Sequence, residues 1–297
     1  MTIGGIIAAM ATPMFEDGSI NEAELRNQVN RQIAAGVTGI FCLGTNGEAY
    51  ILNKEEKIRV MQLFVEEAAG RVPVYAGTGC VGTKDTVELS QKAQELGVGA
   101  LSVISPYFAA INQQELYEHY ASVAQSVDLP IVLYNMPART GNHLDYKTVS
   151  RLAQNFRNIA GIKDSSGNFD NILRYIESTD SESFSVLSGN DSLILWTLMA
   201  GGKGGITAVA NILPEIMVSI YRYWEAGDFE NAKKAQDSIR PIRDCFRFGN
   251  PNSIVKRAAN LIGQPIGPCR KPFGIVSKEA DDAITETLKT YYAAYMK

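Results

Sequence analysis

The chain has 297 residues, of which 45% are hydrophobic and 20% are charged, and its formal net charge is −4. This composition is typical of a globular protein, and the length fits one α/β barrel of roughly 250 residues with an extension. The acidic balance argues against nucleic acid or an anionic membrane as a partner, because both attract clustered Lys and Arg. No run approaches about 18 uninterrupted apolar residues, so we expect no membrane-spanning helix.

The chain alternates short apolar runs with longer amphipathic stretches as far as about residue 227. Eight runs have the length and composition of buried strands, at 5–10, 39–43, 72–76, 100–104, 130–134, 159–162, 184–187 and 205–208. Near-continuous apolar strands are typical of a parallel sheet covered on both faces. Helical patterns are found at 21–35, 54–69, 85–96, 114–127, 146–155 and 214–226. Eight β/α units in series predict a closed (β/α)8 TIM barrel.

A doubly wound open sheet is the alternative fold, and it would carry a dinucleotide fingerprint in its first unit. Residues 77–82 do spell GxGxxG, but only after the third predicted strand. A dinucleotide site also requires an acidic residue at the end of the next strand, which here ends in Ser105-Pro106-Tyr107. We therefore favour the barrel and assign no nucleotide site.

The pattern changes after residue 227 to helices without intervening strands. Helical patterns cover 228–247, 253–261 and 278–296, and five prolines interrupt the region. We divide the chain into a barrel that carries the active site, residues 1–227, and a C-terminal helical extension packed on it, residues 228–297.

Metal-ligating and redox-active side chains are few. The four cysteines, at 42, 80, 245 and 269, form no CxxC pair, which argues against a zinc knuckle or a disulfide scaffold. Only two histidines are present, and we place one of them, His119, on a helix surface. Scattered cysteines and a start without the basic residues of a secretion signal predict a cytoplasmic protein, and we expect no metal site.

Lys163 is the most informative residue, because it follows the apolar run 158–162 and precedes the turn sequence Asp-Ser-Ser-Gly-Asn. This pattern places an ammonium group at the C-terminal end of an interior strand. A buried cation is costly unless it is paired or loses its proton, and a neutral lysine is a nucleophile for carbonyl groups. The alternative is a strand-end lysine whose head group reaches solvent.

Polar side chains also end the second, fifth and seventh predicted strands. Thr45 and Asn46 lie in a glycine loop whose amides and hydroxyl suit a carboxylate, although a plain glycine turn has the same composition. Tyr134 can move protons, and Arg139 can bind a carboxylate through two parallel hydrogen bonds, unless both are merely solvated. Residues 188–191 fit an ordinary helix N-cap equally well. TIM-barrel active sites form at this end of the strands, so these side chains converge there with Lys163.

Five motifs make the chain resemble the dihydrodipicolinate synthase / N-acetylneuraminate lyase family. They are GTNGE at 44–48, YNMPARTG at 134–141, GIKDSSGN at 161–168, SGND at 188–191 and GNPNSIVK at 249–256. The resemblance implies a class I, Schiff-base-forming pyruvate lyase or aldolase on a TIM barrel. By this resemblance Lys163 forms the imine, Tyr134 relays protons, Thr45 links that tyrosine to a second one, and Gly189 and Ile206 line the pyruvate pocket.

The resemblance favours the synthase branch, with two departures. Arg139 matches the arginine that receives the carboxylate of aspartate semialdehyde, which sialic acid lyases generally lack. Asn46 stands where synthases usually have threonine, but an amide also donates to the pyruvate carboxylate. Tyr107 matches an aromatic of the subunit interface. Phe108 stands where synthases carry the relay tyrosine of the neighbouring subunit, so the Tyr–Thr–Tyr relay lacks one hydroxyl.

The expected activity is therefore condensation of pyruvate with aspartate semialdehyde to 4-hydroxy-tetrahydrodipicolinate, a step of lysine biosynthesis. The resemblance implies a homotetramer built as a dimer of dimers, with no metal and no organic cofactor beyond the covalent imine on Lys163. An aldolase or dehydratase for 2-keto-3-deoxy sugar acids and an N-acetylneuraminate lyase are the alternatives. A further one is a barrel that binds 2-keto acids without turnover.

Overall fold

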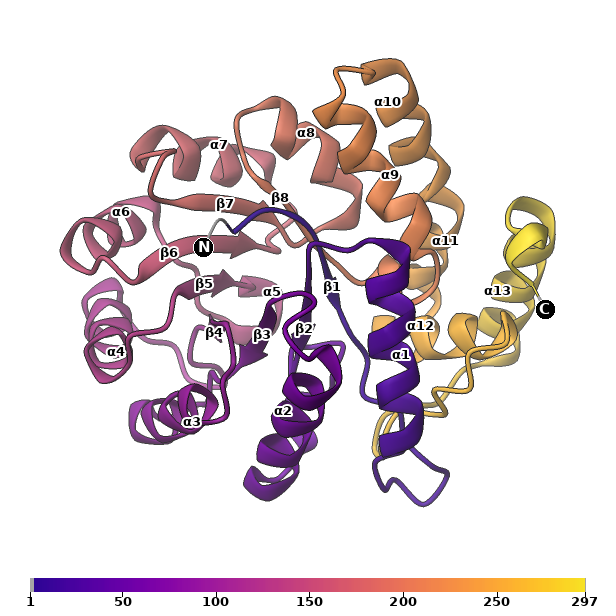
Figure 1. The fold of residues 1–297 in the computed structure, drawn as a ribbon, viewed down its shortest axis with the longest axis horizontal. Coiled ribbons are helices and arrows are strands. Elements are labelled where there is room, and N and C mark those ends of the chain that lie inside the picture. Colours follow the sequence, from indigo (N-terminus) through magenta and orange to yellow (C-terminus); the bar gives the residue numbers. More distant parts are fainter. Residues whose placement is uncertain (1–2, 297) are drawn as a thin grey trace.

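The computed structural model describes residues 3–296 and shows a closed barrel of eight parallel strands (Figure 1). Residues 1 and 2, on which the expectation about a secretion signal partly rests, lie outside the described range. The strands pair in chain order, and β1 closes the barrel against β8. They are β1 (Gly5–Ala9), β2 (Gly39–Cys42), β3 (Val74–Gly77), β4 (Ala100–Ile104), β5 (Ile131–Asn135), β6 (Ile159–Asp164), β7 (Ser185–Ser188) and β8 (Gly204–Thr207). The predicted (β/α)8 TIM barrel is confirmed.

Helices surround the barrel and connect successive strands (Figure 1). They are α1 (Glu22–Ala35), α2 (Lys54–Ala68), α3 (Thr83–Glu95), α4 (Gln113–Ser126), α6 (Tyr146–Asn155), α7 (Phe169–Ser178), α8 (Ile194–Met199) and α9 (Pro214–Glu225), and the short α5 (Pro137–Thr140) follows β5. Several start where an asparagine or aspartate side chain accepts the first free amides, as Asn53 does for α2 and Asn112 for α4. The predicted strands and helices of the barrel begin and end within two residues of those observed.

The strands separate two hydrophobic clusters, because successive side chains of a strand point to opposite faces. One set packs outward against the helices and includes Ile40, Leu133 and Ile162. The other fills the barrel interior and includes Phe41 and Val132. At the C-terminal ends of the strands, side chains on the same face as this interior set point into the mouth of the barrel.

The helical extension lies on one side of the barrel and contains α10 (Phe229–Ser238), α11 (Arg240–Asp244), α12 (Pro251–Leu261) and α13 (Lys278–Tyr291) (Figure 1). The helical pattern predicted over 228–247 is observed, but it is divided into two helices and a 3₁₀ turn. The helix is interrupted at Ile239, and the segment finishes in a 3₁₀ turn, Cys245–Phe248. Pro241 has no N–H to donate to a carbonyl one turn earlier, so it starts a new helix instead of continuing α10. The division at residue 227 stays a prediction.

A buried ion pair joins the extension to the loop after β2. Lys256 Nζ lies 2.6 Å from Glu48 Oε1, with side chains that are 2% and 0% exposed. Lys256 also donates to the carbonyl of Pro268 at 2.8 Å, and the backbone N–H of Arg270 donates to the other Glu48 oxygen at 2.9 Å. Glu48 is the last residue of the GTNGE motif. The extension therefore holds the loop that carries Thr45.

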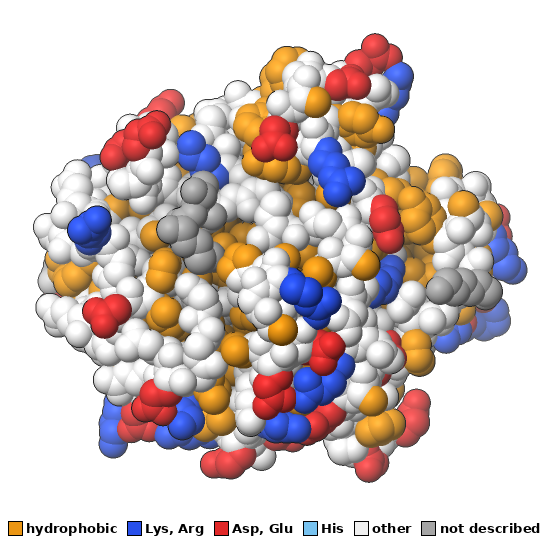
Figure 2. Space-filling model, viewed as in Figure 1, with side chains coloured by type: hydrophobic (Ala, Val, Ile, Leu, Met, Phe, Trp, Pro, Cys, Tyr) orange, Lys and Arg blue, Asp and Glu red, His pale blue; other side chains and the backbone are white. Residues whose placement is uncertain are grey.

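Charges of both signs are interspersed over the face shown in Figure 2, without a broad region of one sign. Such a surface offers no basic patch of the kind that binds nucleic acid. Within residues 3–296, no helix has the length and apolar character needed to cross a membrane.

Replacing Lys256 by methionine should destabilise the protein by about 3–5 kcal/mol, because Glu48 would be left charged and buried without its partner. Urea unfolding of the single variant and of the double variant Lys256→Met/Glu48→Gln measures this effect. The double variant should recover most of the loss. A single variant as stable as the wild type would contradict the role given to the pair.

Candidate active site

Lys163 lies in β6 and projects into the barrel because of a β-bulge. Ile159 pairs with Ile131, but the next residue of β5, Val132, pairs with Gly161, so Ala160 is an extra residue in β6. Ala160 packs toward the interior cluster, whereas Ile162 packs outward. Regular alternation from Ala160 would have placed Ile162 inward and Lys163 outward. The bulge resets the alternation and directs the amine inward.

The Lys163 side chain is 4% exposed and faces aromatic rings. Its Nζ lies 4.1 Å from the ring centroid of Tyr134 and 5.2 Å from that of Phe41. Among residues 3–296, no Asp or Glu oxygen lies within 4.0 Å of it. The expectation of a buried amine is thus confirmed, and the alternative of a solvated head group is wrong for this chain. Electron-rich ring faces compensate part of the cost of burying the charge.

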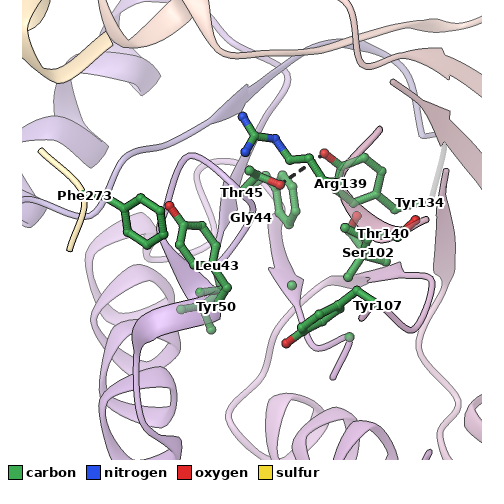
Figure 3. A pocket seen from close by; sticks show the side chains of 15 residues that line it. Leu43, Gly44, Thr45, Tyr50, Ser102, Tyr107, Tyr134, Arg139, Thr140 and Phe273 are labelled. Atoms are coloured by element: carbon green, nitrogen blue, oxygen red, sulfur yellow. Dashed lines mark hydrogen bonds between the residues drawn. The ribbon is translucent and has the colours of Figure 1, made fainter. Parts of the chain in front are cut away.

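Tyr134 is the direct neighbour of Lys163 across β5 and β6, and Thr45 contacts it from the loop after β2. The phenol oxygen of Tyr134 lies 3.3 Å from Thr45 Oγ1, the contact drawn as a dashed line in Figure 3. Burial acts to raise the pKa of the Tyr134 phenol. The positive charge of Lys163 and hydrogen bonds from Thr45, Ser165 and Lys163 outweigh burial, and together they lower this pKa below its ordinary value.

These three side chains line a cavity of about 160 Å³ at the C-terminal end of the barrel. The other predicted site residues also line this cavity, apart from the two aromatics expected at a subunit interface. They are Asn46, Arg139, Gly189 and Ile206. Ile206 in β8 is 1% exposed and supplies an apolar wall. The Asn46 amide donates to the carbonyl of Ala9 at 3.3 Å, which fixes its orientation.

Gly189 keeps the space beside the amine open. A Cβ at this position would lie 2.8 Å from Lys163 Cε and 2.0 Å from Ser165 Oγ. Any side chain here would occupy the space beside the Lys163 amine. The requirement for glycine is therefore steric.

A second hollow of about 220 Å³ adjoins the first, and Thr45, Tyr134 and Arg139 line both. Figure 3 shows Tyr50 and Phe273 on one side of it, Tyr107 on another, and the Arg139 side chain above Thr45. Gly77 and Gly79 of the GxGxxG sequence also line it. A Cβ at Gly77 would lie 2.0 Å from the carbonyl oxygen of Leu43, so close packing of backbone accounts for that glycine.

Phe108 does not join the site in this chain. Its side chain is 98% exposed, and its backbone has a φ of +81°. A bulky residue in the left-handed region is strained, and such strain is commonly found where a residue has a function or an interface. Tyr107, next to it, is half-buried and lines the second hollow.

Four cavity residues come from the extension, Arg243, Phe246, Pro251 and Asn252, and none of them was assigned to the site from the sequence. Asn252 is 2% exposed, and its amide donates to the Thr45 carbonyl at 2.7 Å and to the Tyr50 hydroxyl at 3.1 Å. Arg243 in α11 also lines the cavity. Asn252 lies in the GNPNSIVK motif, which could have drawn attention to it. Arg243 lies in an ordinary helical pattern with no local feature that marks it.

The histidines lie apart from the cavity. The prediction that His119 lies on a helix surface is wrong, because it is 4% exposed on the same face of α4 as the buried Leu116 and Tyr120. Its Nδ1 lies 2.9 Å from Thr83 Oγ1, and burial lowers its pKa to about 4. His143 is exposed. Across the described part of the chain, no group of three or more His, Cys, Asp or Glu side chains is arranged to hold a metal ion.

The fold and this lysine-centred cavity define a TIM-barrel enzyme, and comparisons with known proteins specify the family. The model of the dihydrodipicolinate synthetase family matches residues 2–291. The chain is 38% identical to the 4-hydroxy-tetrahydrodipicolinate synthase of Methanopyrus kandleri, over 97% of this chain and 96% of that protein. It is 39% identical to 4-hydroxy-tetrahydrodipicolinate synthase 1 of Halalkalibacterium halodurans, over 92% of each chain.

Solved structures agree with these relatives. The dihydrodipicolinate synthase of Aquifex aeolicus superposes with a TM-score of 0.94 at 35% identity, over 97% of this chain and 98% of that one. YagE of E. coli K12, solved in complex with pyruvate, superposes with a TM-score of 0.94 at 31% identity, over 98% and 99%. The chain belongs to the dihydrodipicolinate synthetase family.

The lowered pKa of Tyr134 should depend on the charge of Lys163. In Lys163→Met the phenol loses the nearby cation that stabilises its phenolate, so its pKa should rise. Ultraviolet titration near 295 nm measures this, as the difference between Lys163→Met and Lys163→Met/Tyr134→Phe. The same difference between wild type and Tyr134→Phe is the reference. An equal or lower midpoint in Lys163→Met would show that the two groups do not interact.

Proposed function

We propose that this chain is a class I lyase that condenses pyruvate with aspartate semialdehyde to give 4-hydroxy-tetrahydrodipicolinate. The buried amine of Lys163, beside the Tyr134 phenol in an open cavity, is the observation that carries this proposal. Relatives bearing the synthase name, at 35–39% identity over most of the chain, support it. So does the similar structure of YagE, which was solved with pyruvate.

The first half-reaction forms an imine on Lys163. The carboxylate of pyruvate binds at the loop of Thr45 and Asn46, which places the keto carbon near the amine. A Tyr134 phenolate can take a proton from the neighbouring ammonium, which leaves the neutral amine that attacks the ketone. Loss of water gives a protonated imine. This group withdraws electrons, so a methyl proton can leave to form an enamine.

The second half-reaction joins the enamine carbon to the aldehyde carbon of the acceptor. Arg139 orients the acceptor by its carboxylate, and Tyr134 protonates the oxygen that was the aldehyde. The acceptor's amino group then attacks the imine carbon, closes the ring and releases the Lys163 amine. These steps require neither a metal nor an organic cofactor.

An alternative keeps Lys163 and changes the acceptor. Asn46 and the missing hydroxyl at Phe108 are the observations that favour an aldolase or dehydratase for 2-keto-3-deoxy sugar acids, or an N-acetylneuraminate lyase. Parallel assays of aspartate semialdehyde and a panel of such acids distinguish these activities.

We further propose a homotetramer, a dimer of dimers, in which Tyr107 and Phe108 lie at a subunit interface. The strained and almost fully exposed Phe108 ring supports this, since an interface with a second copy would cover it. We also propose a cytoplasmic location, which the four free cysteines support.

Borohydride reduction in the presence of pyruvate should attach a pyruvate-derived group to Lys163, because hydride reduces the imine to a stable amine. Peptide mass spectrometry locates the adduct. Lys163→Ala should carry none, and Gly189→Ala should carry much less because its methyl group occupies the ketone's place. The absence of an adduct, or its persistence in Lys163→Ala, would defeat the mechanism.

Phe108→Tyr should raise turnover on aspartate semialdehyde by about tenfold or more, if a phenol from the neighbouring subunit supplies the missing proton-transfer group. The measurement is kcat with pyruvate and aspartate semialdehyde, beside wild type and the non-hydroxylated control Phe108→Leu. The pyruvate adduct should be equal in all three. No turnover in any of them would point to another acceptor.

A further inference from the structure

Arg243 lines the same cavity as Lys163 and Arg139, although it belongs to the helical extension. Its side chain is 24% exposed, and its guanidinium lies 4.8 Å from the ring centroid of Phe246. It therefore stands at the cavity wall as a largely buried cation and not as a solvated surface arginine.

Contacts to the loop after β7 hold the guanidinium in one orientation. Nη2 donates to Asn190 Oδ1 at 3.0 Å, Nε to Ser192 Oγ at 3.4 Å, and Nη1 to Asp191 Oδ2 at 3.4 Å. Asp191 is itself fixed, since it is 2% exposed and its other oxygen accepts from the Ala208 amide at 3.1 Å. A guanidinium has five N–H groups, and these contacts use three. One N–H remains on each of Nη1 and Nη2.

The charged side chains of the cavity do not balance. Arg139 and Arg243 supply two permanent positive charges, and Asp191 supplies one negative charge. An excess of one positive charge remains even when Lys163 is neutral. Pyruvate brings a single carboxylate, whose place is the loop of Thr45 and Asn46. The remaining positive charge in the cavity is complementary to a second anionic group.

We propose that Arg243 determines acceptor specificity by donating its two remaining N–H groups to the acceptor's carboxylate, which it shares with Arg139. This inference rests on the proposed function and narrows it. The site selects an aldehyde that carries a carboxylate over a neutral sugar aldehyde of similar size. The extension thus contributes directly to substrate recognition.

The test compares Arg243→Met and Arg243→Lys with the matched control Arg247→Met. Arg247 lies one turn further along, its guanidinium also lies 4.8 Å from a phenylalanine ring centroid, that of Phe248, and it does not line the cavity. Steady-state kinetics with pyruvate are run on aspartate semialdehyde and on its methyl ester, which keeps the aldehyde and the amine, adds one methyl group and lacks the negative charge. Borohydride trapping of pyruvate on Lys163 reports the first half-reaction separately.

Arg243→Met should raise KM for aspartate semialdehyde by about tenfold or more, and leave KM for pyruvate and the trapped adduct unchanged. The preference for the acid over the ester should shrink. Arg243→Lys should keep part of this preference, and Arg247→Met should keep all of it. Equal losses on both aldehydes, or no change, would overturn the inference.

A binding measurement separates this inference from the proposed reaction. Calorimetry gives the affinity of succinate semialdehyde, which keeps the carboxylate and lacks the amine, for the borohydride-reduced pyruvate adduct. Binding that weakens in Arg243→Met supports the inference even where aspartate semialdehyde is not turned over, an outcome that refutes only the proposed acceptor. Binding that is absent in wild type, or equal in Arg243→Met, overturns the inference.

Discussion

The site depends on a lysine amine held inside a closed barrel against the ring of Tyr134. An ammonium group in such a place has lost most of its hydration, and the rings of Tyr134 and Phe41 lie beside it. The same proximity lowers the pKa of the Tyr134 phenol, so a proton can pass between two groups that are neighbours across one strand pair. Backbone register therefore places the proposed nucleophile beside its proposed proton acceptor.

The helical extension completes this site from outside the barrel. Lys256 pairs with Glu48 at the end of the glycine loop, Asn252 donates to the Thr45 carbonyl, and Arg243 lines the cavity. The loop after β2 is thus held both by the barrel and by contacts with the extension. Substitutions that disturb the packing of α11 or α12 are therefore expected to lower enzymatic activity as well as stability.

Much of this arrangement could be predicted from the sequence, because parallel strands bring their C-terminal ends to one face. Lys163, Tyr134 and Thr45 each follow an apolar run, so a barrel necessarily gathers them. Arg243 could not be found in this way, since its position depends on how α11 packs on the barrel. The placement of His119 was wrong because it is a polar residue on the buried face of α4. In the short segment around it, the neighbouring polar residues suggest an exposed helix face. Pro241 is a signal in the sequence for the interruption between α10 and α11. The helical patterns on both sides of it suggest one continuous helix instead.

The bulge at Ala160 sets a different kind of limit on variation in β6. A substitution in β6 changes one side chain, whereas a deletion or insertion of one residue between the bulge and Lys163 changes the face on which the amine lies. If β6 kept all its residues but ran regularly from Ile159, the proposed nucleophile would face the surrounding helices and Ile162 would face the cavity. The length of this segment is therefore constrained more tightly than its composition, and homologous chains should tolerate exchanges of apolar residues in β6 far better than gaps.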